Sequence, residues 1–169
     1  MDIRELLSDG DLRSIGHVDQ VIEYVGNDPD RFKELMNGLT DDRPVVRMRS
    51  ADAMEKVTRH HPELLQAHQA SLFQQLHRAT QQEVRWHLAQ VMPRMTWTEE
   101  EAADIAHVLT DWIDTETSNI VIVNSLQAIF DLSAVHPRFR DELRALLETQ
   151  LEEGSPALKS RAKKLLQKL

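Results

Sequence analysis

A short pattern recurs along the chain at a nearly constant interval, and no other feature of the sequence constrains the fold as strongly. Its copies begin 38, 37 and 37 residues apart, at Val46, Val84, Val121 and Leu158. A second marker keeps the same frame, because the dipeptides His61-Pro62 and His136-Pro137 lie two periods apart. Repeats of this length with helical spacing indicate stacked helix pairs, each of which buries its apolar face against its neighbours.

The first two copies share the motif Val-Arg-x-x-x-Ala, in which Ala51 and Ala89 follow the arginine by four residues. This motif on the second helix of such a repeat resembles HEAT-type (armadillo-like) helical repeats, over about residues 29–169. We therefore expect an all-α, right-handed α-α superhelix (solenoid) of about four helical pairs, with an irregular N-terminal helical segment. The third copy departs from the motif because Ile122 replaces the arginine, which interrupts any ladder of arginine–acid pairs between repeats.

Helix-start signals divide the chain further. Five of the six prolines stand where a helix is expected to begin, and Pro93 is expected to kink a helix near its end. Thr98 and Glu101 form a capping-box signature. The helices after the first repeat are expected at about 62–78, 82–95, 98–113, 118–134, 137–152 and 156–168. The chain is then one helical-repeat domain with a cap at 1–28 and repeats at 29–61, 62–97, 98–136 and 137–169.

Composition narrows the class of protein. The chain has no cysteine, which excludes a disulfide framework, a thiolate metal site and a cysteine nucleophile. The N-terminus lacks the apolar run of a signal peptide and no uncharged stretch is long enough to span a membrane, so we expect a cytoplasmic protein. The net charge is −8, and the segment between Met95 and Pro137 contains acids but no Lys or Arg. The third repeat is therefore an acidic block.

The second helix of each repeat has one face that packs on the first helices and one that remains free. Rows of equivalent positions on the free face follow from the repeat. The first row is Met48, Trp86, Val123 and Ser160, of which the first three are apolar. The second is Arg49, His87, Asn124 and Arg161, the third is Asp52, Gln90, Gln127 and Lys164, and the fourth is Lys56, Arg94, Asp131 and Lys168. An unburied tryptophan in the first row is a typical anchor for a partner helix or peptide. Alternatively, the apolar row closes the seam between adjacent second helices.

The sequence predicts a non-enzymatic interaction or scaffold module that binds a protein partner on the concave face of the second helices. The residues expected to contact the partner are Met48, Arg49, Trp86, His87, Gln90, Val123, Asn124, Gln127 and Arg161. This prediction rests on the extended surface that the fold offers and on the lack of residues spaced as a catalytic group.

A nucleic-acid-binding protein, or a HEAT-like DNA glycosylase for alkylated bases, is the alternative from another class. Trp112 beside Asp111, together with Trp86 and Arg85, invites the comparison with such glycosylases. Trp112, however, is spaced as a core residue. Nucleic acid is further disfavoured by the acidic pI of about 5.4. No metal, cofactor or membrane is expected, since the histidines show no ligand spacing. The basic C-terminal helix is expected to cap the last repeat, although it could also dock on an acidic partner or a membrane surface.

Overall fold

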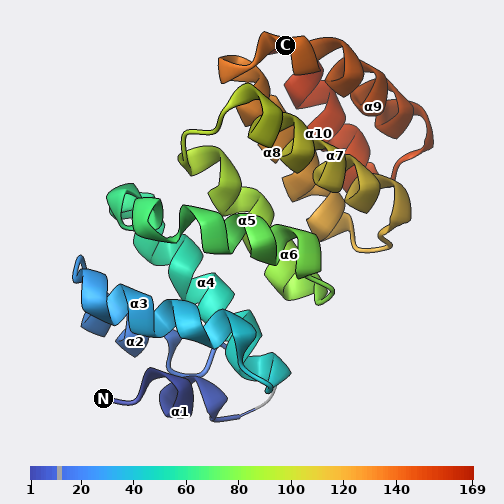
Figure 1. The fold of residues 1–169 in the computed structure, drawn as a ribbon. Helices are drawn as coiled ribbons and strands as arrows, with labels where there is room; N and C mark the ends of the chain where they lie inside the picture. The colour runs from blue at the N-terminus through green and yellow to red at the C-terminus, as the bar shows by residue number, and fades with distance from the viewer. Residues whose placement is uncertain (11–12) are drawn as a thin grey trace. The chain divides into compact units, whose positions relative to one another are not determined.

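The structure is a computed structural model of the chain, and it describes residues 1–10 and 13–169. Every regular element within these residues is a helix, so the predicted all-α, helical-repeat class is confirmed. The chain divides into two compact units, Met1–Val91 (unit 1) and Met92–Leu169 (unit 2), which are described separately (Figure 1).

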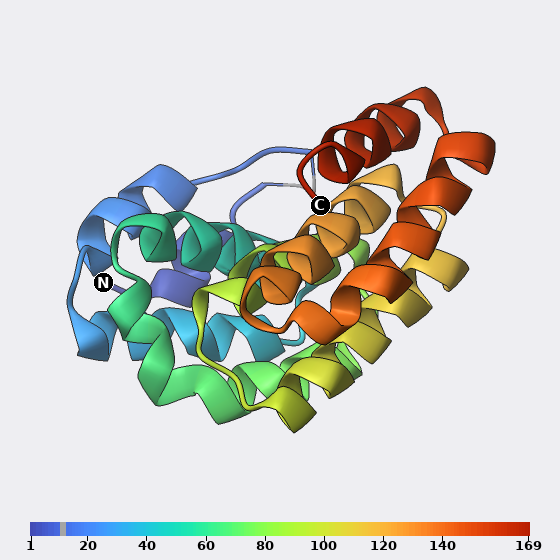
Figure 2. The ribbon, with the colours of Figure 1, turned by 90° about the horizontal axis from the view of Figure 1, so that it is seen from above.

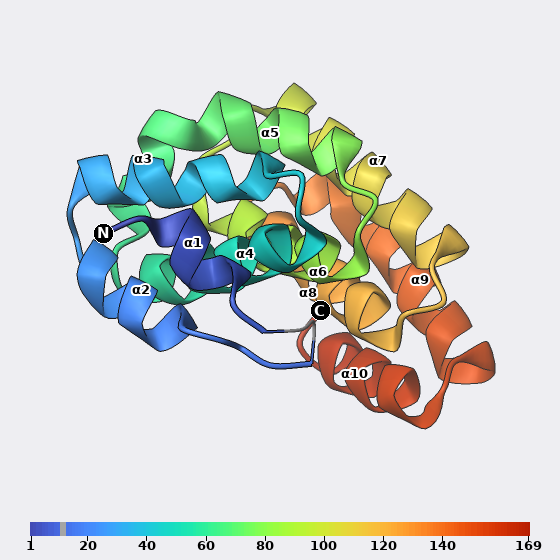
Figure 3. The same ribbon diagram turned by 90° about the horizontal axis from the view of Figure 1, so that it is seen from below.

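Unit 1 is organised around one long central helix. Its elements are α1 (Ile3–Ser8), α2 (Val18–Val25), α3 (Pro29–Asn37), a 3₁₀ turn (Gly38–Thr40), α4 (Pro44–His60), a 3₁₀ segment (Pro62–His68), α5 (Gln69–Arg78) and α6 (Gln82–Val91). Helix α4 packs against α1, α2, α3 and α6. Within this unit, α3 and α5 lie on one side and α4 and α6 on the other (Figure 3). The first and second helices of the repeats therefore form an outer and an inner layer.

Unit 2 repeats this plan with two helix pairs. Its elements are a 3₁₀ turn (Met92–Arg94), α7 (Glu99–Thr115), α8 (Asn119–Val135), a second 3₁₀ turn (Pro137–Phe139), α9 (Arg140–Glu153) and α10 (Pro156–Leu166). Helix α8 packs against α7, α9 and α10, and α9 packs against α10 (Figure 2). Short connections make consecutive helices antiparallel neighbours. The inner layer of this unit is formed by α8 and α10.

The core follows the period read from the sequence. The four residues that begin the copies of the pattern are at most 5% exposed, and they are Val46, Val84, Val121 and Leu158. The residue four places after each of them is fully buried, and in three of the four copies it is small, namely Ser50, Ser125 and Ala162. Small residues at this position let the two layers approach each other closely, and the aliphatic lead residues fill the space between them.

The arginine of the repeat motif makes the same hydrogen bond to the main chain in both repeats of unit 1. Nη1 of Arg47 donates to the carbonyl oxygen of Asp41 at 2.8 Å, six residues earlier. Nε of Arg85 donates to the carbonyl oxygen of Ala79 at 2.8 Å, again six residues earlier. Each arginine thus satisfies a carbonyl in the turn between the two helices of its repeat. These bonds lie within one repeat, and Nε of Arg47 also donates to Oε1 of Gln81 in the next repeat at 3.1 Å.

Two helices differ from the sequence-based expectation. The α-helix expected at 82–95 ends at Val91, and Pro93 lies in a 3₁₀ turn instead of kinking the helix. Proline has no N–H to donate to the carbonyl four residues earlier, so the α-helical ladder stops there. Indole Nε1 of Trp97 donates to the carbonyl oxygen of Met92 at 2.7 Å and stabilises the end of this turn. The single helix expected at 62–78 is a 3₁₀ segment followed by α5.

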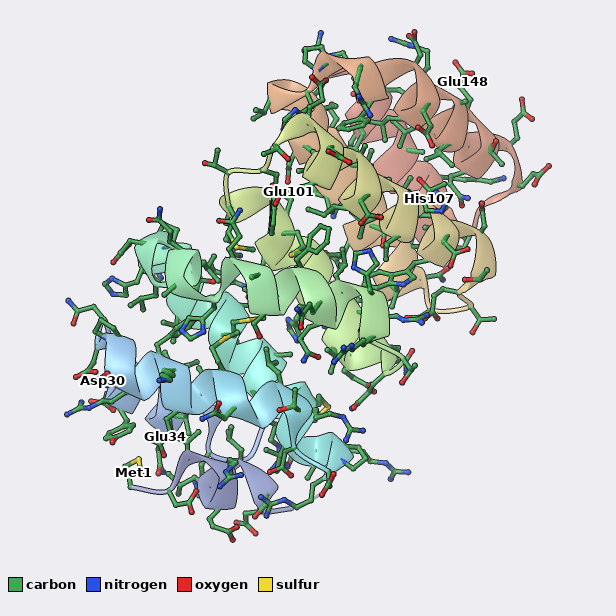
Figure 4. All side chains as sticks on the ribbon, viewed as in Figure 1. Met1, Asp30, Glu34, Glu101, His107 and Glu148 are labelled. Carbon is green, nitrogen blue, oxygen red and sulfur yellow. The ribbon has the colours of Figure 1, made fainter. Side chains whose placement is uncertain are left out.

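Side-chain caps position several helices. The capping box predicted at the start of α7 is confirmed: the amide of Glu101 donates to Oγ1 of Thr98 at 3.2 Å, and Oε2 of Glu101 accepts from the amide of Thr98 at 2.9 Å. At the other end of the chain, Oε1 of Glu34 in α3 accepts from the amide of Ile3 at 3.3 Å. Figure 4 labels Glu34 and Glu101 among the side chains. The bond from Glu34 ties α1 to the outer helix of the first repeat.

Candidate functional site

A pocket of about 300 Å³ opens on the inner layer of unit 1. The second helices α4 and α6 form two of its walls, and the segment that precedes α2 forms the third. Its lining residues are Arg13, Ser14 and Ile15 from that segment, Met48, Arg49, Asp52 and Lys56 from α4, and Trp86 and His87 from α6. Met48 and Trp86, the members of the apolar row that belong to the first two repeats, therefore line the same pocket.

The lining follows from helical spacing. Met48, Asp52 and Lys56 are four residues apart and lie one above another on a single face of α4. Trp86 and His87 stand side by side on α6, with their ring centroids 5.6 Å apart. Both Met48 and Trp86 are partly exposed. Apolar side chains of this size that remain in contact with water are suited to receiving a partner's side chain.

Arg49 was expected on an exposed groove, but this expectation is wrong, because its side chain is buried with 1% exposure. Its guanidinium donates to the carbonyl oxygens of Leu7, Asp9 and Ser14 and to Oγ of Ser14. Arg49 thus links the N-terminal segment to α4, and it has almost no exposed surface to offer a partner. A buried guanidinium requires several acceptors, and main-chain carbonyls supply them here.

The segment before α2 approaches Arg49 closely because it contains glycine. Gly16 has a φ of +54°, which L-residues with a side chain rarely adopt. A Cβ at this position would lie 2.6 Å from Nη1 of Arg49, so a side chain would displace the guanidinium. Gly16 therefore allows the main chain of Ser14 and Ile15 to lie against α4 and form the third wall of the pocket.

Polar contacts connect the two inner helices beside the pocket. Oδ2 of Asp52 accepts from Nζ of Lys56 at 2.9 Å, and Oδ1 lies 3.8 Å from Nε2 of His87. Nδ1 of His87 is 3.3 Å from Oε1 of Gln90. Burial lowers the pKa of His87, and the nearby charge of Asp52 opposes this shift. The imidazole is therefore mostly neutral at neutral pH.

The predicted site residues of the other unit form a separate group on α8 and α10. Oε1 of Gln127 accepts from Nη1 of Arg161 at 2.7 Å, and Nε2 of Gln127 donates to Oδ1 of Asp131 at 2.9 Å. Burial raises the pKa of Asp131, against the effects of Gln127 and Arg161. Val123 is partly buried, and Nδ2 of Asn124 donates to the carbonyl oxygen of Ile120 at 2.8 Å.

The same two rows of positions lie next to each other in unit 1 and in unit 2. His87 of the second repeat lies 3.8 Å from Asp52 of the first, and Arg161 of the fourth repeat bonds Gln127 of the third. In each case a residue of the second row contacts a residue of the third row in the preceding repeat. Of the two contacts only the one between Arg161 and Gln127 is a hydrogen bond, and it links α8 and α10 through side chains that the sequence assigned to partner binding.

Sequence reasoning missed the N-terminal wall of the pocket. Ile15 is 54% exposed and lines the pocket, yet it belongs to no repeat and to no predicted helix. The sequence signal for turns was the pair of glycines on either side of this segment, Gly10 and Gly16, and both adopt a positive φ in the structure. That signal indicates turns but does not reveal which helix the segment contacts.

A larger cleft of about 780 Å³ lies on the outer layer of unit 1, between α3 and residues 62–68. Its lining mixes both charges, with Asp30 and Lys33 on α3 and Glu63 and His68 on the 3₁₀ segment. Figure 4 labels Asp30 at the N-terminal end of α3. The cleft has no aromatic lining apart from His68, whose ring packs edge-on against buried Phe32 at 5.4 Å. Its apolar lining consists of Pro29, Leu64 and Ala67, whereas the inner pocket presents the larger side chains of Met48 and Trp86.

The comparison with base-excision enzymes finds no support in the geometry. Trp112 is 3% exposed in the core of α7, as its spacing predicted, while the neighbouring Asp111 is exposed. Trp112 therefore belongs to the core and Asp111 to the surface. Among the described residues, no three His, Asp or Glu side chains are grouped as metal ligands would be.

No helix within residues 1–10 and 13–169 has both the length and the apolar character required to cross a membrane. No curated protein and no solved structure matches the chain. The family described as HEAT repeat domain matches residues 5–169, which is nearly the whole length of the chain. Together with the paired helices and the period of their core residues, this match shows that the chain belongs to the HEAT repeat family.

Proposed function

We propose that the protein is a non-enzymatic interaction module whose inner-layer pocket in unit 1 receives a side chain of a protein partner. HEAT repeats generally mediate protein interactions, and their stacked helices offer long surfaces for this purpose. One observation carries the choice of pocket: Met48 and Trp86 stay partly exposed at a cavity of about 300 Å³, while the lead residues of their own repeats are buried. If these two side chains only closed a seam, they would leave no such cavity between them.

In unit 2, Val123 and Asn124 of α8 are proposed to form a second and weaker contact with the partner. Gln127 and Arg161 hold α8 and α10 together and support this patch from the side. Val123 is a smaller side chain than Trp86, so its truncation removes less contact area. The main loss of affinity is therefore expected from changes on α6.

Affinity capture with the immobilised protein tests the proposal. Partners recovered by the wild type are quantified by mass spectrometry and compared with those recovered by Trp86→Ala, which empties one wall of the pocket. The matched control is Phe73→Ala on α5, since Phe73 is also a partly exposed aromatic residue of unit 1 but lies outside the pocket. Circular dichroism verifies that both variants remain folded.

The expected result is that a specific set of proteins is depleted about tenfold or more with Trp86→Ala and retained with Phe73→Ala, as for loss of a hot-spot aromatic residue. Equal recovery by the wild type and Trp86→Ala would show that the pocket is not the binding site. Val123→Ala is expected to cause a smaller depletion of the same set.

A further inference from the structure

Lysines give the last helix of unit 2 an exposed cationic surface. Residues 154–169 contain four lysines and one arginine but no Asp or Glu. All four lysines are exposed, namely Lys159, Lys163, Lys164 and Lys168. Among the residues that the structure describes, none of their ammonium groups forms an ion pair or a hydrogen bond. Their positive charge therefore has no direct counterpart within unit 2 and is open to another molecule.

The helical register places two of these lysines on the inner layer. Nη1 of Arg161 donates to Oε1 of Gln127 on α8 at 2.7 Å, so this side of α10 adjoins α8. Lys164 and Lys168 follow Arg161 by three and seven residues and lie on the same side of the helix. Lys159 precedes Lys164 by five residues, which places it about 140° further around the helix. Lys164 and Lys168 therefore share a surface with α8, which lies beside α10 (Figure 3).

Helix α8 contributes an apolar strip to this surface. Ile120 is 52% exposed, and Val123 is partly buried. They precede Gln127 by seven and four residues, so they lie on the side of α8 from which Gln127 reaches Arg161. The two aliphatic side chains offer adjacent apolar atoms on which one side chain of a partner can pack.

One carboxylate lies on the same surface, and it already has partners. Oδ1 of Asp131 accepts from Nε2 of Gln127 at 2.9 Å, and the positive charge of Arg161 acts on the same carboxyl. Asp131 and Arg161 therefore offset each other. Lys164 and Lys168 remain, so this surface is cationic although the whole chain carries a net charge of −8.

We infer that α8 and α10 bind an acidic peptide segment of a protein partner, whose carboxylates face Lys164 and Lys168. An apolar side chain of the same segment packs on Ile120 and Val123. The inference rests on the proposed function and deepens it, because it names the chemistry of the part of the partner that contacts Val123 and Asn124. An apolar contact with complementary charge at its margin is the usual composition of such an interface.

The register also specifies the spacing within the bound segment. Ala157 is the position of α10 equivalent to Ile120 of α8, one period later. Lys164 and Lys168 lie seven and eleven residues beyond Ala157, which is about 10 and 16 Å along the helix axis. An extended peptide covers these distances with about three to five residues. The acidic residues of the segment should therefore stand about three to five positions from its apolar residue.

A peptide fits this surface better than a membrane or a nucleic acid. The apolar face of α10 is at most 5% exposed at Leu158, Ala162 and Leu165, so the helix has no apolar face to insert into a bilayer. Helix α10 has no aromatic side chain on which a base could stack. A long polyanion would also be repelled by the net charge of −8, which a short acidic segment largely avoids.

The probe for the test is a phage-displayed library of random dodecapeptides, depleted on immobilised Ile120→Ser and then selected on the immobilised wild type. The depletion removes peptides that bind elsewhere, and serine adds no charge that would bias the selection. Enriched peptides are synthesised with a fluorescent label, and their dissociation constants are measured by fluorescence anisotropy. We expect the enriched sequences to contain Asp or Glu about three to five positions from a Leu, Ile or Phe.

Variants of the two lysines test the charge. The double variant Lys164→Glu with Lys168→Glu is expected to weaken binding about tenfold or more, because like charges then face the peptide. The neutral double variant Lys164→Gln with Lys168→Gln should weaken it several-fold. High salt should weaken binding to the wild type, because it screens the exposed charges. Circular dichroism verifies that each variant remains folded.

The matched control is the double variant Lys159→Glu with Lys163→Glu. It changes the net charge equally and on the same helix, but on a side that does not adjoin α8. Its affinity for the peptides should stay within about twofold of the wild type. Equal weakening by the two double reversals would show that only net charge matters, and the inference would be wrong.

Three further outcomes would overturn the inference. The first is that no enriched peptide depends on Ile120. The second is that the enriched peptides are basic or uncharged. The third is that a single-stranded DNA oligonucleotide, or vesicles that contain phosphatidylserine, bind more tightly than the peptides, since the surface would then receive a nucleic acid or a membrane.

The measurements also separate the inference from the function on which it rests. Peptides that lose affinity with Ile120→Ser but ignore Lys164→Glu with Lys168→Glu would leave the contact on α8 standing and overturn its acidic occupant. Equal partner recovery by the wild type and Trp86→Ala would overturn the pocket of unit 1, whereas the peptides report on α8 and α10 alone.

Discussion

Arg49 holds Ser14 through two hydrogen bonds across 35 residues of sequence: Nε donates to the carbonyl oxygen at 3.1 Å and Nη2 to the hydroxyl at 2.9 Å. The arginine is almost fully buried in α4, whereas Ser14 lies in the segment that forms one wall of the pocket. The same guanidinium also binds the carbonyl oxygen of Leu7 at 2.8 Å, at the end of α1. One side chain thus connects the N-terminal cap to the first repeat.

Replacement of Arg49 by methionine is expected to lower the free energy of unfolding by about 2–4 kcal/mol, because several carbonyl acceptors lose their donors within a buried site. Urea denaturation followed by circular dichroism measures the loss. Limited proteolysis is expected to cleave the segment around Ser14 faster than in the wild type.

Arg31→Met on α3 serves as the control for loss of an arginine. Arg31 is exposed and stacks over Tyr24 at 4.5 Å, so its replacement is expected to change stability by no more than about 1 kcal/mol. Similar losses for Arg49→Met and Arg31→Met would contradict the role given to the buried bonds.

Gly16→Ala tests the same connection from the other side. The new Cβ would overlap the guanidinium of Arg49 and the backbone would have to keep a positive φ, so a loss of about 2–3 kcal/mol is expected. In the double variant Gly16→Ala with Arg49→Met the overlap disappears. The loss of unfolding free energy in the double variant, measured by urea denaturation, should therefore be smaller than the sum of the losses in the two single variants. Full additivity would show that the close approach has no energetic consequence.

The sequence predicted those parts of the fold that depend on local or periodic signals. The lead residues of the pattern are buried, and the capping box of Thr98 and Glu101 forms as expected. Both follow from side chains within one helix or one repeat, so neighbouring residues are enough to identify them. The register of Met48 and Trp86 was predictable for the same reason.

The placement of Arg49 could not be predicted, because it depends on a segment outside the period. By its register Arg49 stands in the same row as His87, and only the folding of Ser14 over α4 removes it from solvent. A sequence shows neither the path of an irregular segment nor the carbonyls that it will offer. The 3₁₀ segment before α5 was missed for a related reason, since helical spacing alone does not separate it from an α-helix.

Arg85→Met tests the bond that the repeat motif makes to the turn before its helix. Loss of the donor to the carbonyl oxygen of Ala79 is expected to lower the free energy of unfolding by about 1–2 kcal/mol. Lys159→Met is the matched control, since Lys159 occupies the same position of the fourth repeat but is exposed. Its effect in the same urea titration should remain within about 0.5 kcal/mol. Equal effects at the two positions would mean that the motif arginine has no structural role.

His87 makes the stability of the protein depend on pH near neutrality. Burial lowers its pKa from the usual 6.5, against the opposing charge of Asp52. The unfolded chain therefore takes up a proton at a higher pH than the folded one. Stability from this group is complete above about 6.5 and falls as the pH decreases through this value toward the lower pKa of the folded state.

Urea unfolding at a series of pH values between about 7 and 5 measures this dependence, and His87→Gln is expected to make it shallower. His68 contributes in the same direction, because burial and then Lys33 lower its pKa. The double variant with His68→Gln should be shallower still. Parallel pH profiles for wild type and His87→Gln would contradict the assignment.

Asp41 gives a second dependence on pH at a lower range. Its Oδ1 accepts from Nε of Arg43 at 2.8 Å and its Oδ2 from Nη2 at 3.1 Å, and this bonding lowers the pKa of the carboxyl to about 2. Because the folded pKa lies below the usual 3.8, the stabilisation is present above pH 3.8 and is lost as the pH falls toward 2.

Asp41→Asn is expected to lower the free energy of unfolding by about 1 kcal/mol at neutral pH, a modest value because water screens a pair at the surface. Asp42→Asn, at the exposed neighbouring residue, should cost less than about 0.5 kcal/mol in the same urea titrations. The difference between wild type and Asp41→Asn should narrow as the pH is lowered to about 3, and a constant difference would show that the charge of Asp41 is not its source.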